Sequence, residues 1–562
     1  MKVDLRALAL LVVATPLALA DTDHPVRSPA GMVVSQSTLA SQVGAEVLGA
    51  GGTAVDAAVA TAFALAVTHP AAGNVGGGGF LLYRPEEGEP TAYDFRETAP
   101  AASTPTMFLK KGAYDEGLHH ESHLSVGVPG TVAGLHLAWK ENGRLPWRRL
   151  VEPAIALAKD GFAVKDGFAR SLQAALPALR AHPASLAQFS KHGVPYEAGD
   201  IFKQEDLART LERIAVEGPA GFYQGETARL LVQEIRAGGG VITLADLEAY
   251  APKKRRPVRG TYRGYEILGM PPPSSGGVAL IEMLNVLEGY DLKATGPGSA
   301  ATVHLIVEAM RRAFADRARH IGDPDFNPEL PVARLTSKEY AAALRKTIRV
   351  RQASKSAPET FEWPRESAET THLSVVDAKR NAVSLTYTLE DSYGSKIVVP
   401  GAGFLLNNEM GDFNAGPGLT NRKGLVGTPP NLAAPGKRML SSMTPTILAR
   451  NGKAFLVIGS PGGRTIINTV LLVILNVVDF GLNVQEAIDA PRFHHQWLPD
   501  VIRYERYGLS PDTVALLKAR GHTLAEASVQ GVAQGIVFDA QSGLLEGGTD
   551  RRATDGGADA TP

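Results

Sequence analysis

The stretch ETTHLSVVD (369–377) marks the point at which the character of the chain changes. Before it, residues 353–369 are polar, contain two prolines and show no apolar period, which predicts an exposed linker. After Thr370 the chain is rich in β-branched and aliphatic residues with short polar breaks, which predicts strands. The sequence therefore predicts that Thr370 lies where a linker meets a strand, and this position bears on both the fold and the chemistry.

A threonine hydroxyl is a weak nucleophile at neutral pH unless a base lies beside it. An N-terminal threonine supplies that base itself, because its α-amine has a pKa near 7.7–8.0. Cleavage of the bond before Thr370 would create such a terminus. The sequence contains no cysteine and no G-x-S-x-G motif, so this hydroxyl is worth weighing as a nucleophile. Two threonines at the start of a strand are also common on β propensity alone.

Composition limits the classes of protein that fit. The chain has 562 residues, of which 44% are apolar and 20% charged, the balance of a globular protein. Its length predicts three or four domains or one large intertwined fold. With 57 basic and 58 acidic residues the net charge is -1, which argues against nucleic acid or an anionic membrane as the main partner. The absence of cysteine excludes disulfides and thiolate metal sites.

The first twenty residues are typical of a secretory signal peptide. Lys2 and Arg6 precede an apolar stretch, and Ala18-Leu19-Ala20 supplies a small-x-small cleavage pattern. Later apolar runs, at 57–67 and 466–478, are shorter than the roughly 20 residues that a membrane span requires. We therefore expect an exported protein, periplasmic or secreted, that is soluble and has no membrane span.

The mature chain has two differently patterned halves. Residues 39–350 read as Ala- and Leu-rich helices separated by Gly and Pro, whereas the chain after Thr370 reads as short strands. Individual elements expected are helices over 56–67 and 301–319 and strands around 373–376, 382–385, 397–399, 404–406 and 455–458.

Several motifs that suggest other functions are better explained by structure. The run Gly76–Gly79 lacks the G-x-G-x-x-G spacing of a dinucleotide site and predicts close backbone packing at a core strand. The basic run 253–256, bounded by prolines, predicts a solvated loop. The histidine pairs 119–120 and 494–495 are adjacent and not spaced i, i+4, so no metal site is expected.

Nine sequence blocks resemble the γ-glutamyltranspeptidase family, in order and over nearly all of the mature chain. They are AAGNVGGGGF (71–80), DFRETAP (94–100), GVPGTVAG (127–134), PPPSSGG (271–277), TTHLSVVD (370–377), NAVSLTYTLE (381–390), LLNNEMGDF (405–413), LSSMTPT (440–446) and GSPGGRTI (459–466). The resemblance implies an α/β fold of the N-terminal-nucleophile hydrolase type, an αββα four-layer sandwich. It also implies self-cleavage between Glu369 and Thr370 into a large subunit (21–369) and a small subunit (370–562) that remain intertwined as a heterodimer.

The resemblance assigns a catalytic group of four residues. Thr370 matches the nucleophile, and Thr388 matches a hydroxyl that hydrogen-bonds the nucleophile and assists processing. Gly462 and Gly463 match the backbone N–H pair of an oxyanion hole, where glycine permits close approach. Without the resemblance, Thr388 would be an ordinary strand residue and the two glycines a turn.

A second group matches the residues that bind the amino acid head of a γ-glutamyl substrate. Arg96 matches the residue that holds the α-carboxylate, and its planar fork suits a bidentate contact. Ser441 and Ser442 match hydroxyls that donate to the same carboxylate, and Glu409 and Asp412 match acids around the α-ammonium. Without the resemblance, Arg96 would be interpreted as part of a structural ion pair. The two serines would be interpreted as a turn, and the two acids as a solvated loop.

The implied reaction is attack of Thr370 on the γ-carbonyl to form a γ-glutamyl ester, released by water or by an amino acid or dipeptide acceptor. Glutathione and other γ-glutamyl compounds are the expected substrates, and no metal or organic cofactor is required. Two positions depart from some relatives: Glu390, where other members carry Asn, and Lys423, where some bacterial members carry an aromatic residue in a lid segment.

Two alternatives follow from the same observations. The family also contains cephalosporin acylases, which act on a glutaryl amide without an α-ammonium; the presence of both Glu409 and Asp412 favours the γ-glutamyl substrate. The other alternative is a non-catalytic exported binding protein that keeps the fold. An intact Thr370 with both Gly462 and Gly463 argues against that reading.

Overall fold

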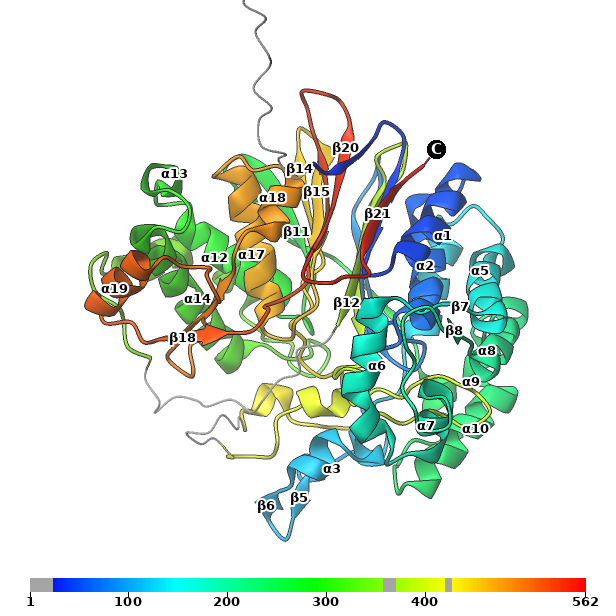
Figure 1. Ribbon diagram of the computed structural model, residues 1–562. Coiled ribbons are helices and arrows are strands. Elements are labelled where there is room, and N and C mark those ends of the chain that lie inside the picture. Colours follow the sequence, from blue (N-terminus) through cyan, green and yellow to red (C-terminus); the bar gives the residue numbers. More distant parts are fainter. Residues whose placement is uncertain (1–23, 357–369, 420–426, 562) are drawn as a thin grey trace, which may run out of the picture.

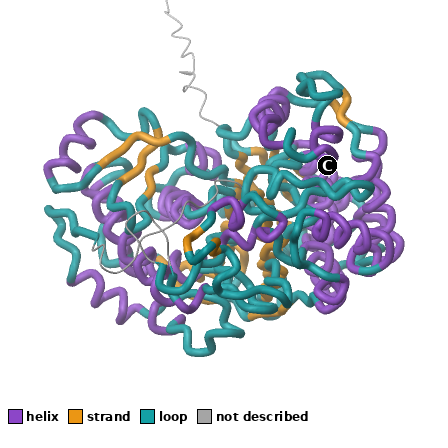
Figure 2. Tube along the Cα trace, turned by 90° about the horizontal axis from the view of Figure 1, so that it is seen from below, coloured by secondary structure: helices purple, strands orange, loops and turns teal. Residues whose placement is uncertain are grey.

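The structure, a computed structural model, describes residues 24–356, 370–419 and 427–561. Two seven-stranded sheets lie at the centre of the molecule, and helices cover the outer face of each sheet (Figure 1). Figure 2, a view from below, shows the same order, with strands in the middle and helices on both flanks. This arrangement confirms the αββα four-layer sandwich that the resemblance implied.

Neighbouring strands in both sheets are antiparallel throughout. The first sheet contains, in spatial order, β1 (Val26–Ser28), β20 (Leu545–Thr549), β19 (Gln534–Phe538), β15 (Lys453–Gly459), β14 (Thr446–Arg450), β11 (Tyr265–Gly269) and β10 (Val258–Tyr262). The second contains β21 (Gly557–Ala560), β2 (Met32–Ser35), β12 (Thr371–Val376), β13 (Ala382–Thr388), β3 (Gly78–Arg84), β4 (Thr91–Phe95) and β9 (Lys253–Arg255).

Each sheet has its own helical layer. The layer on the second sheet includes α1 (Thr38–Gly49), α2 (Ala54–Thr68), α5 (Trp147–Asp160) and α8 (Glu205–Glu217). The layer on the first sheet includes α12 (Gly276–Leu287), α14 (Ala300–His320), α17 (Thr465–Val478) and α18 (Val484–Asp489). Helices α2 and α14 confirm the two helices expected from sequence, each extended by one or two residues at its ends.

The side chains of β12 alternate between a helical layer and the opposite sheet. Leu373 and Val375 belong to the core cluster that contains α2. Between them, the hydroxyl of Ser374 donates to the main-chain oxygen of Gln534 in the opposite sheet, at 3.1 Å. Because side chains alternate along a strand, Thr370, just before β12, lies on the side that faces the space between the two sheets.

The two parts of the chain on either side of the 357–369 segment are interleaved. Among the described strands, five ladders join a strand before this segment to one after it: β1 with β20, β2 with β12, β2 with β21, β3 with β13, and β11 with β14. Neither part contains a complete sheet. The strands of both parts therefore build the same two sheets, which fits one large intertwined fold, the second of the two expectations from length.

The sequence did not predict the strands of the first part. Residues 78–84 and 91–95 are buried on both sheet faces, so they show no alternation of apolar and polar residues. The expectation of a loop at 253–256 was wrong, since β9 pairs with β4 at the edge of the second sheet. Its Arg255 forms an ion pair of 2.7 Å with the buried carboxylate of Asp94.

Two of the expected strands do not form. Residues 397–399 and 404–406 are joined by an isolated bridge between Val398 and Leu405, and the N–H of Val399 donates to the oxygen of Phe404 at 3.0 Å. The turn between them contains two glycines with positive φ, Gly401 and Gly403. Within the described ranges, no helix is long and apolar enough to cross a membrane. The expected signal peptide, residues 1–20, lies outside the described residues.

The glycine run at 76–79 packs closely against β13, as expected. A Cβ built on Gly79 would lie 2.6 Å from the main-chain oxygen of Thr386 and closer still to Tyr387. Real side chains do not approach backbone so closely, so only glycine fits at this position without a shift of β13. Strand β13 ends at Thr388, and the glycine run therefore fixes the position of a candidate site residue.

We expect Gly79→Ala to lower the melting temperature by several degrees, because overpacking a well-filled core costs about 1–3 kcal/mol. Gly117→Ala is the matched control, since a Cβ there meets no described atom closer than 3.4 Å and the residue lies in a short surface helix. Thermal unfolding of both variants beside the parent checks this. Equal melting temperatures for all three would show that β13 can move aside.

Candidate active site

Nine of the ten residues singled out from the sequence line one small pocket. They are Arg96, Thr370, Thr388, Glu390, Glu409, Asp412, Ser441, Ser442 and Gly463, and Met443 and Ile466 complete the wall. The tenth, Gly462, is the neighbour of Gly463 in the chain. The pocket has a volume of about 30 Å³, so its walls are already nearly in contact. Glu369 and Lys423 lie outside the described residues.

Thr370 and Thr388 face each other across two paired strands. Thr371 is paired with Tyr387 in the antiparallel register of β12 and β13, which places Thr370 opposite Thr388. Thr370 is 3% exposed. The hydroxyl of Thr388 accepts a hydrogen bond from the N–H of Glu390 at 3.0 Å. Its main-chain oxygen accepts from the side chain of Asn74 at 2.9 Å, so both ends of the residue are fixed.

Gly462 and Gly463 form the turn between β15 and helix α17. Their φ angles are 129° and 54°, values that favour glycine, and a Cβ on Gly462 would lie 2.5 Å from the hydroxyl of Thr465. Helix α17 begins at Thr465, so this turn lies at the positive end of the helix dipole. Backbone N–H groups in such a place are suited to stabilising a developing oxyanion beside Thr370.

Arg96 is fully buried and surrounded by carboxyl groups. It follows β4, and its guanidinium forms ion pairs with Glu409 and Asp412 and lies 3.6 Å from Glu97. Burial alone would lower the pKa of Arg96, but the neighbouring carboxylates raise it above its usual value, so it remains charged. The resemblance implied that the arginine and the two acids bind opposite ends of a substrate. In the structure they bind one another.

The acids of this cluster outnumber its cation. Burial raises the pKa of Glu97 to about 7, although Arg96 acts in the opposite direction. Burial also raises the pKa values of Glu409 and Glu390 well above the usual range, and nearby carboxylates add to both shifts. Four carboxyl groups thus share one guanidinium in a buried space. A ligand that carries an ammonium group would favour the ionised forms of these acids and pair with them.

Ser441 and Ser442 are held by Arg317 and Ser275, two residues without a predicted role. The Ser442 hydroxyl accepts a hydrogen bond from the guanidinium of Arg317 at 2.8 Å. The Nε of Arg317 donates to the hydroxyl of Ser275, which in turn donates to the main-chain oxygen of Ser441, both at 2.7 Å. This chain of hydrogen bonds orients the serine pair at the pocket wall.

Some of these supporting residues could have been found from sequence. Ser275 lies in the block PPPSSGG, and Glu97 directly follows Arg96 in DFRETAP. Arg317 had no such signal. It lies near the end of the helical run expected at 301–319, where a basic residue usually reads as a solvated helix end.

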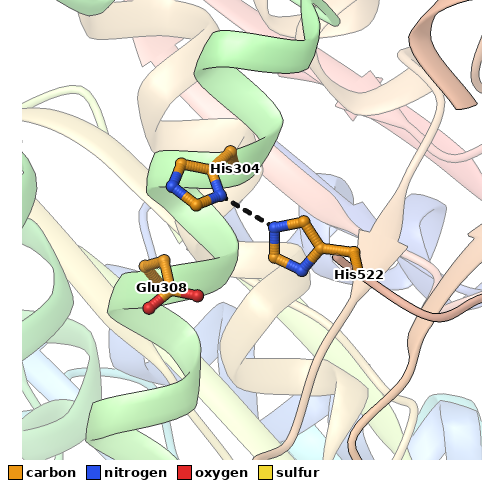
Figure 3. Close-up of side chains that lie close together, drawn as sticks. All are labelled: His304, Glu308 and His522. Atoms are coloured by element: carbon orange, nitrogen blue, oxygen red, sulfur yellow. Dashed lines mark hydrogen bonds between the residues drawn. The ribbon is translucent and has the colours of Figure 1, made fainter. Parts of the chain in front are cut away.

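One group of described side chains has the composition of a metal site. His304 and Glu308 lie one turn apart on α14, and His522 approaches them from the segment after α19 (Pro511–Ala519), with the potential ligand atoms within 4.8 Å of one another (Figure 3). The Nε2 of His304 donates to the main-chain oxygen of Arg349 at 2.9 Å, so its Nδ1 is an acceptor. His522 donates to that Nδ1 at 2.8 Å (Figure 3).

The environment of this group fits a hydrogen-bonded cluster better than a bound cation. The Glu308 carboxylate forms ion pairs with Arg312 at 2.7 Å and Arg311 at 3.4 Å. Burial lowers the pKa of both histidines, that of His522 to about 3, so both are neutral and use their nitrogens on each other. A metal ion would have to break two ion pairs and the hydrogen bond of the histidine pair.

Comparison with solved structures defines the class of the protein. A cephalosporin acylase from Bacillus halodurans superposes with a TM-score of 0.84 at 28% identity, over 98% of this chain and 99% of that chain. A γ-glutamyltranspeptidase from Helicobacter pylori is 46% identical, with a TM-score of 0.56, over 56% of this chain and 91% of that chain. The fold is thus that of an N-terminal-nucleophile hydrolase.

Sequence comparison gives the family. The family model described as gamma-glutamyltranspeptidase matches residues 40–560. A glutathione hydrolase proenzyme from Escherichia coli strain K12 is 48% identical over 540 residues, which is 95% of this chain and 92% of that protein. The chain belongs to the γ-glutamyltranspeptidase family and is an enzyme of γ-glutamyl transfer or hydrolysis.

Proposed function

We propose that the chain cuts itself between Glu369 and Thr370 and that the mature enzyme hydrolyses glutathione and related γ-glutamyl compounds or transfers their γ-glutamyl group. The observation that carries this proposal is the position of Thr370. It is buried at the start of β12, opposite Thr388 and in the same pocket as Gly463 and the Arg96 cluster. The name and 48% identity of the Escherichia coli relative support glutathione as a substrate.

The Arg96 cluster suits the head of a γ-glutamyl group, which carries both a carboxylate and an ammonium. Entry of the head exchanges one set of ion pairs for another: the substrate carboxylate binds Arg96 with Ser441 and Ser442, and the ammonium binds Glu409 and Asp412. Both charges of the substrate and of the pocket are then compensated in a buried place. Glu390, whose pKa is raised, adds a further acceptor near the ammonium.

The reaction requires only groups of the chain itself. After the cut, the α-amine of Thr370 takes the proton of its own hydroxyl, and the hydroxyl oxygen attacks the γ-carbonyl. The N–H groups of Gly462 and Gly463 stabilise the oxyanion, and the amide nitrogen leaves with the proton. Water, or the amine of an amino acid or dipeptide, then attacks the γ-glutamyl ester and restores the hydroxyl of Thr370.

Charge balance distinguishes this function from glutaryl amide hydrolysis. A glutaryl group would bring its carboxylate to Arg96 but no ammonium, so the acids that Arg96 then releases would have no cation to pair with. The residues Glu409 and Asp412, both at Arg96, therefore favour the γ-glutamyl substrate. The N-terminal signal pattern supports export to the periplasm or the medium as the place where this activity is used.

Maturation is the first test. Residues 21–369 and 370–562 should appear as fragments of about 37 and 20 kDa from the 59.4 kDa chain. N-terminal sequencing of the smaller fragment should read Thr370-Thr371-His372, and any other start would contradict the proposed nucleophile. Thr370→Ala should remain one chain, because the hydroxyl that attacks the preceding bond is gone.

The second test is a comparison of substrates. The purified enzyme should turn over glutathione and glutamine at least tenfold faster, in kcat/KM, than a glutaryl amide with the same leaving group, because an interaction with the missing ammonium is worth more than ~1.4 kcal/mol in a buried site. Addition of a dipeptide measures transfer beside hydrolysis. Preference for the glutaryl amide would make the chain an acylase, and no turnover by a cleaved chain would exclude both functions.

The third test concerns Arg96. Loss of a bidentate charged contact in a closed site costs about 2–5 kcal/mol, so Arg96→Ala should lower kcat/KM by roughly 30-fold to several thousand-fold. Arg96→Lys keeps a cation among the carboxylates but not the fork, and should recover little activity.

Measuring self-cleavage in these variants distinguishes a loss of catalysis from a loss of folding. Processing involves no substrate carboxylate, so both variants should still be cut, as should the control Arg259→Ala, which removes an exposed ion pair with Glu89. Parent-like turnover by Arg96→Ala would return Arg96 to a structural role. Failure of both Arg96 variants to self-cleave would assign it to folding.

A further inference from the structure

A small hairpin and a short helix at the lower edge of the molecule in Figure 1 bring a histidine to the active-site pocket. These elements are β5 (Leu109–Lys110), β6 (Ala113–Tyr114) and α3 (Glu116–His120). The Nδ1 of His120, the last residue of α3, lies 3.4 Å from the Oε1 of Glu390. Glu390 lines the pocket that contains Thr370, and the resemblance assigns no role to His120.

Helix α3 is held against the acidic turn of the pocket. The Nε2 of His119 donates to the main-chain oxygen of Met410, within the short 3-10 helix Glu409–Asp412, at 3.0 Å. The hydroxyl of Tyr114 donates to the Nδ1 of His119 at 3.1 Å. Both ring nitrogens of His119 are therefore used within the fold, and they fix α3 beside the two acids of that 3-10 helix.

One side chain also ties α3 to the turn that carries Glu390. The amide nitrogen of Asn408 donates to the main-chain oxygen of His120 at 3.1 Å and to the carboxylate of Asp391 at 3.0 Å. Its amide oxygen accepts from the N–H of Asp391 at 3.1 Å. Because Asp391 directly follows Glu390, the main chains that carry the imidazole and the carboxyl group have fixed places relative to each other.

The side chains of His120 and Glu390 meet beside Gly411. A Cβ built on Gly411 would lie 2.7 Å from the Oε1 of Glu390 and closer still to the Nδ1 of His120. A larger residue at this position would therefore push the pair aside. The side chain of Glu390 is 5% exposed and that of His120 is 15% exposed, so little water reaches the carboxyl group in place of the imidazole.

We propose that His120 is a positioning residue that holds the carboxyl group of Glu390 next to Glu409 and Asp412, and that it thereby increases the selection of substrates with an α-ammonium. Burial lowers the pKa of His120, so its ring is neutral near pH 7. A neutral imidazole suits both states of the acid, because Nδ1 accepts from a protonated carboxyl group in one tautomer and donates to a carboxylate in the other.

This arrangement prepares Glu390 before the substrate arrives. A carboxylate without such support would be ordered only when the ammonium binds, and the lost side-chain freedom would weaken binding. This inference rests on the proposed function and adds to it a residue that determines how strongly the α-ammonium is selected.

The test uses two donors with the same leaving group, γ-glutamyl p-nitroanilide and glutaryl p-nitroanilide, which differ only in the α-amino group. For His120→Leu we expect the ratio of kcat/KM for the γ-glutamyl donor to that for the glutaryl donor to fall about 3- to 10-fold, as suits the loss of one hydrogen bond. His120→Asn places an amide near the position of Nδ1 and should recover most of the ratio.

The matched control is His24→Leu, which replaces an exposed histidine before β1 and should keep the parent ratio. Where turnover of the glutaryl donor is too slow to measure, the inhibition constants of glutamate and glutarate report the same selection. Both compounds carry the carboxylate that would bind Arg96, and only glutamate carries the ammonium.

Coupling to Glu390 distinguishes positioning from a general loss of structure. In a Glu390→Gln background, His120→Leu should change the ratio by less than about twofold, because the carboxyl group that the histidine positions is gone. A parent-like ratio in His120→Leu, an equal loss on both donors, or the full loss again in the Glu390→Gln background would each overturn the proposal. A parent enzyme inactive on both donors, or without preference for the γ-glutamyl donor, would instead contradict the proposed function.

Discussion

The buried guanidinium of Arg96 is the interaction on which the rest of the site depends. Arg96 and Glu97 come from the part of the chain before the 357–369 segment, whereas Glu409 and Asp412 come from the part after it. Breaking a buried charge pair by removing one partner costs several kcal/mol, because the other partner remains uncompensated. The cluster therefore holds the two parts of the chain together at the place where a substrate must enter. It also favours ligands that bring both a negative and a positive group.

The sequence predicted the site better than it predicted the sheets. Residues such as Arg96 and Gly463, about 370 positions apart, were recognised because each lies in a short motif that resembles the family, and the structure brings them into one pocket. Their catalytic roles stay predictions. The strands at 78–84 and 253–255 were missed for a physical reason: a strand buried on both faces has no alternation, and an edge strand rich in lysine and arginine resembles a loop. Arg317 was missed because nothing local distinguishes it from a solvated helix end.

Glu308, which lies beside the two histidines in Figure 3, also holds the chain just before residue 357. The N–H of Ser354 donates to Glu308 at 3.0 Å, and that of Ser356 donates to Asp500 at 2.9 Å. The chain is thus fixed immediately before residue 357, by an acid on α14 and another from the second part of the chain. On the other side of residues 357–369, Thr370 directly precedes β12, a central strand of the second sheet. Well-packed parts of the fold therefore lie directly before residue 357 and directly after residue 369.

The five ladders between the two parts of the chain have a consequence for the lifetime of the mature enzyme. Before the proposed cut, unfolding yields one molecule that can refold by itself. After it, unfolding yields two separate chains, each lacking central or flanking strands of both sheets, and their reunion becomes a second-order process that slows with dilution. Persistence of the cut enzyme is then governed by the rate of strand separation and no longer by an equilibrium. At high dilution, each cut molecule that unfolds is therefore lost, because its two chains do not meet again.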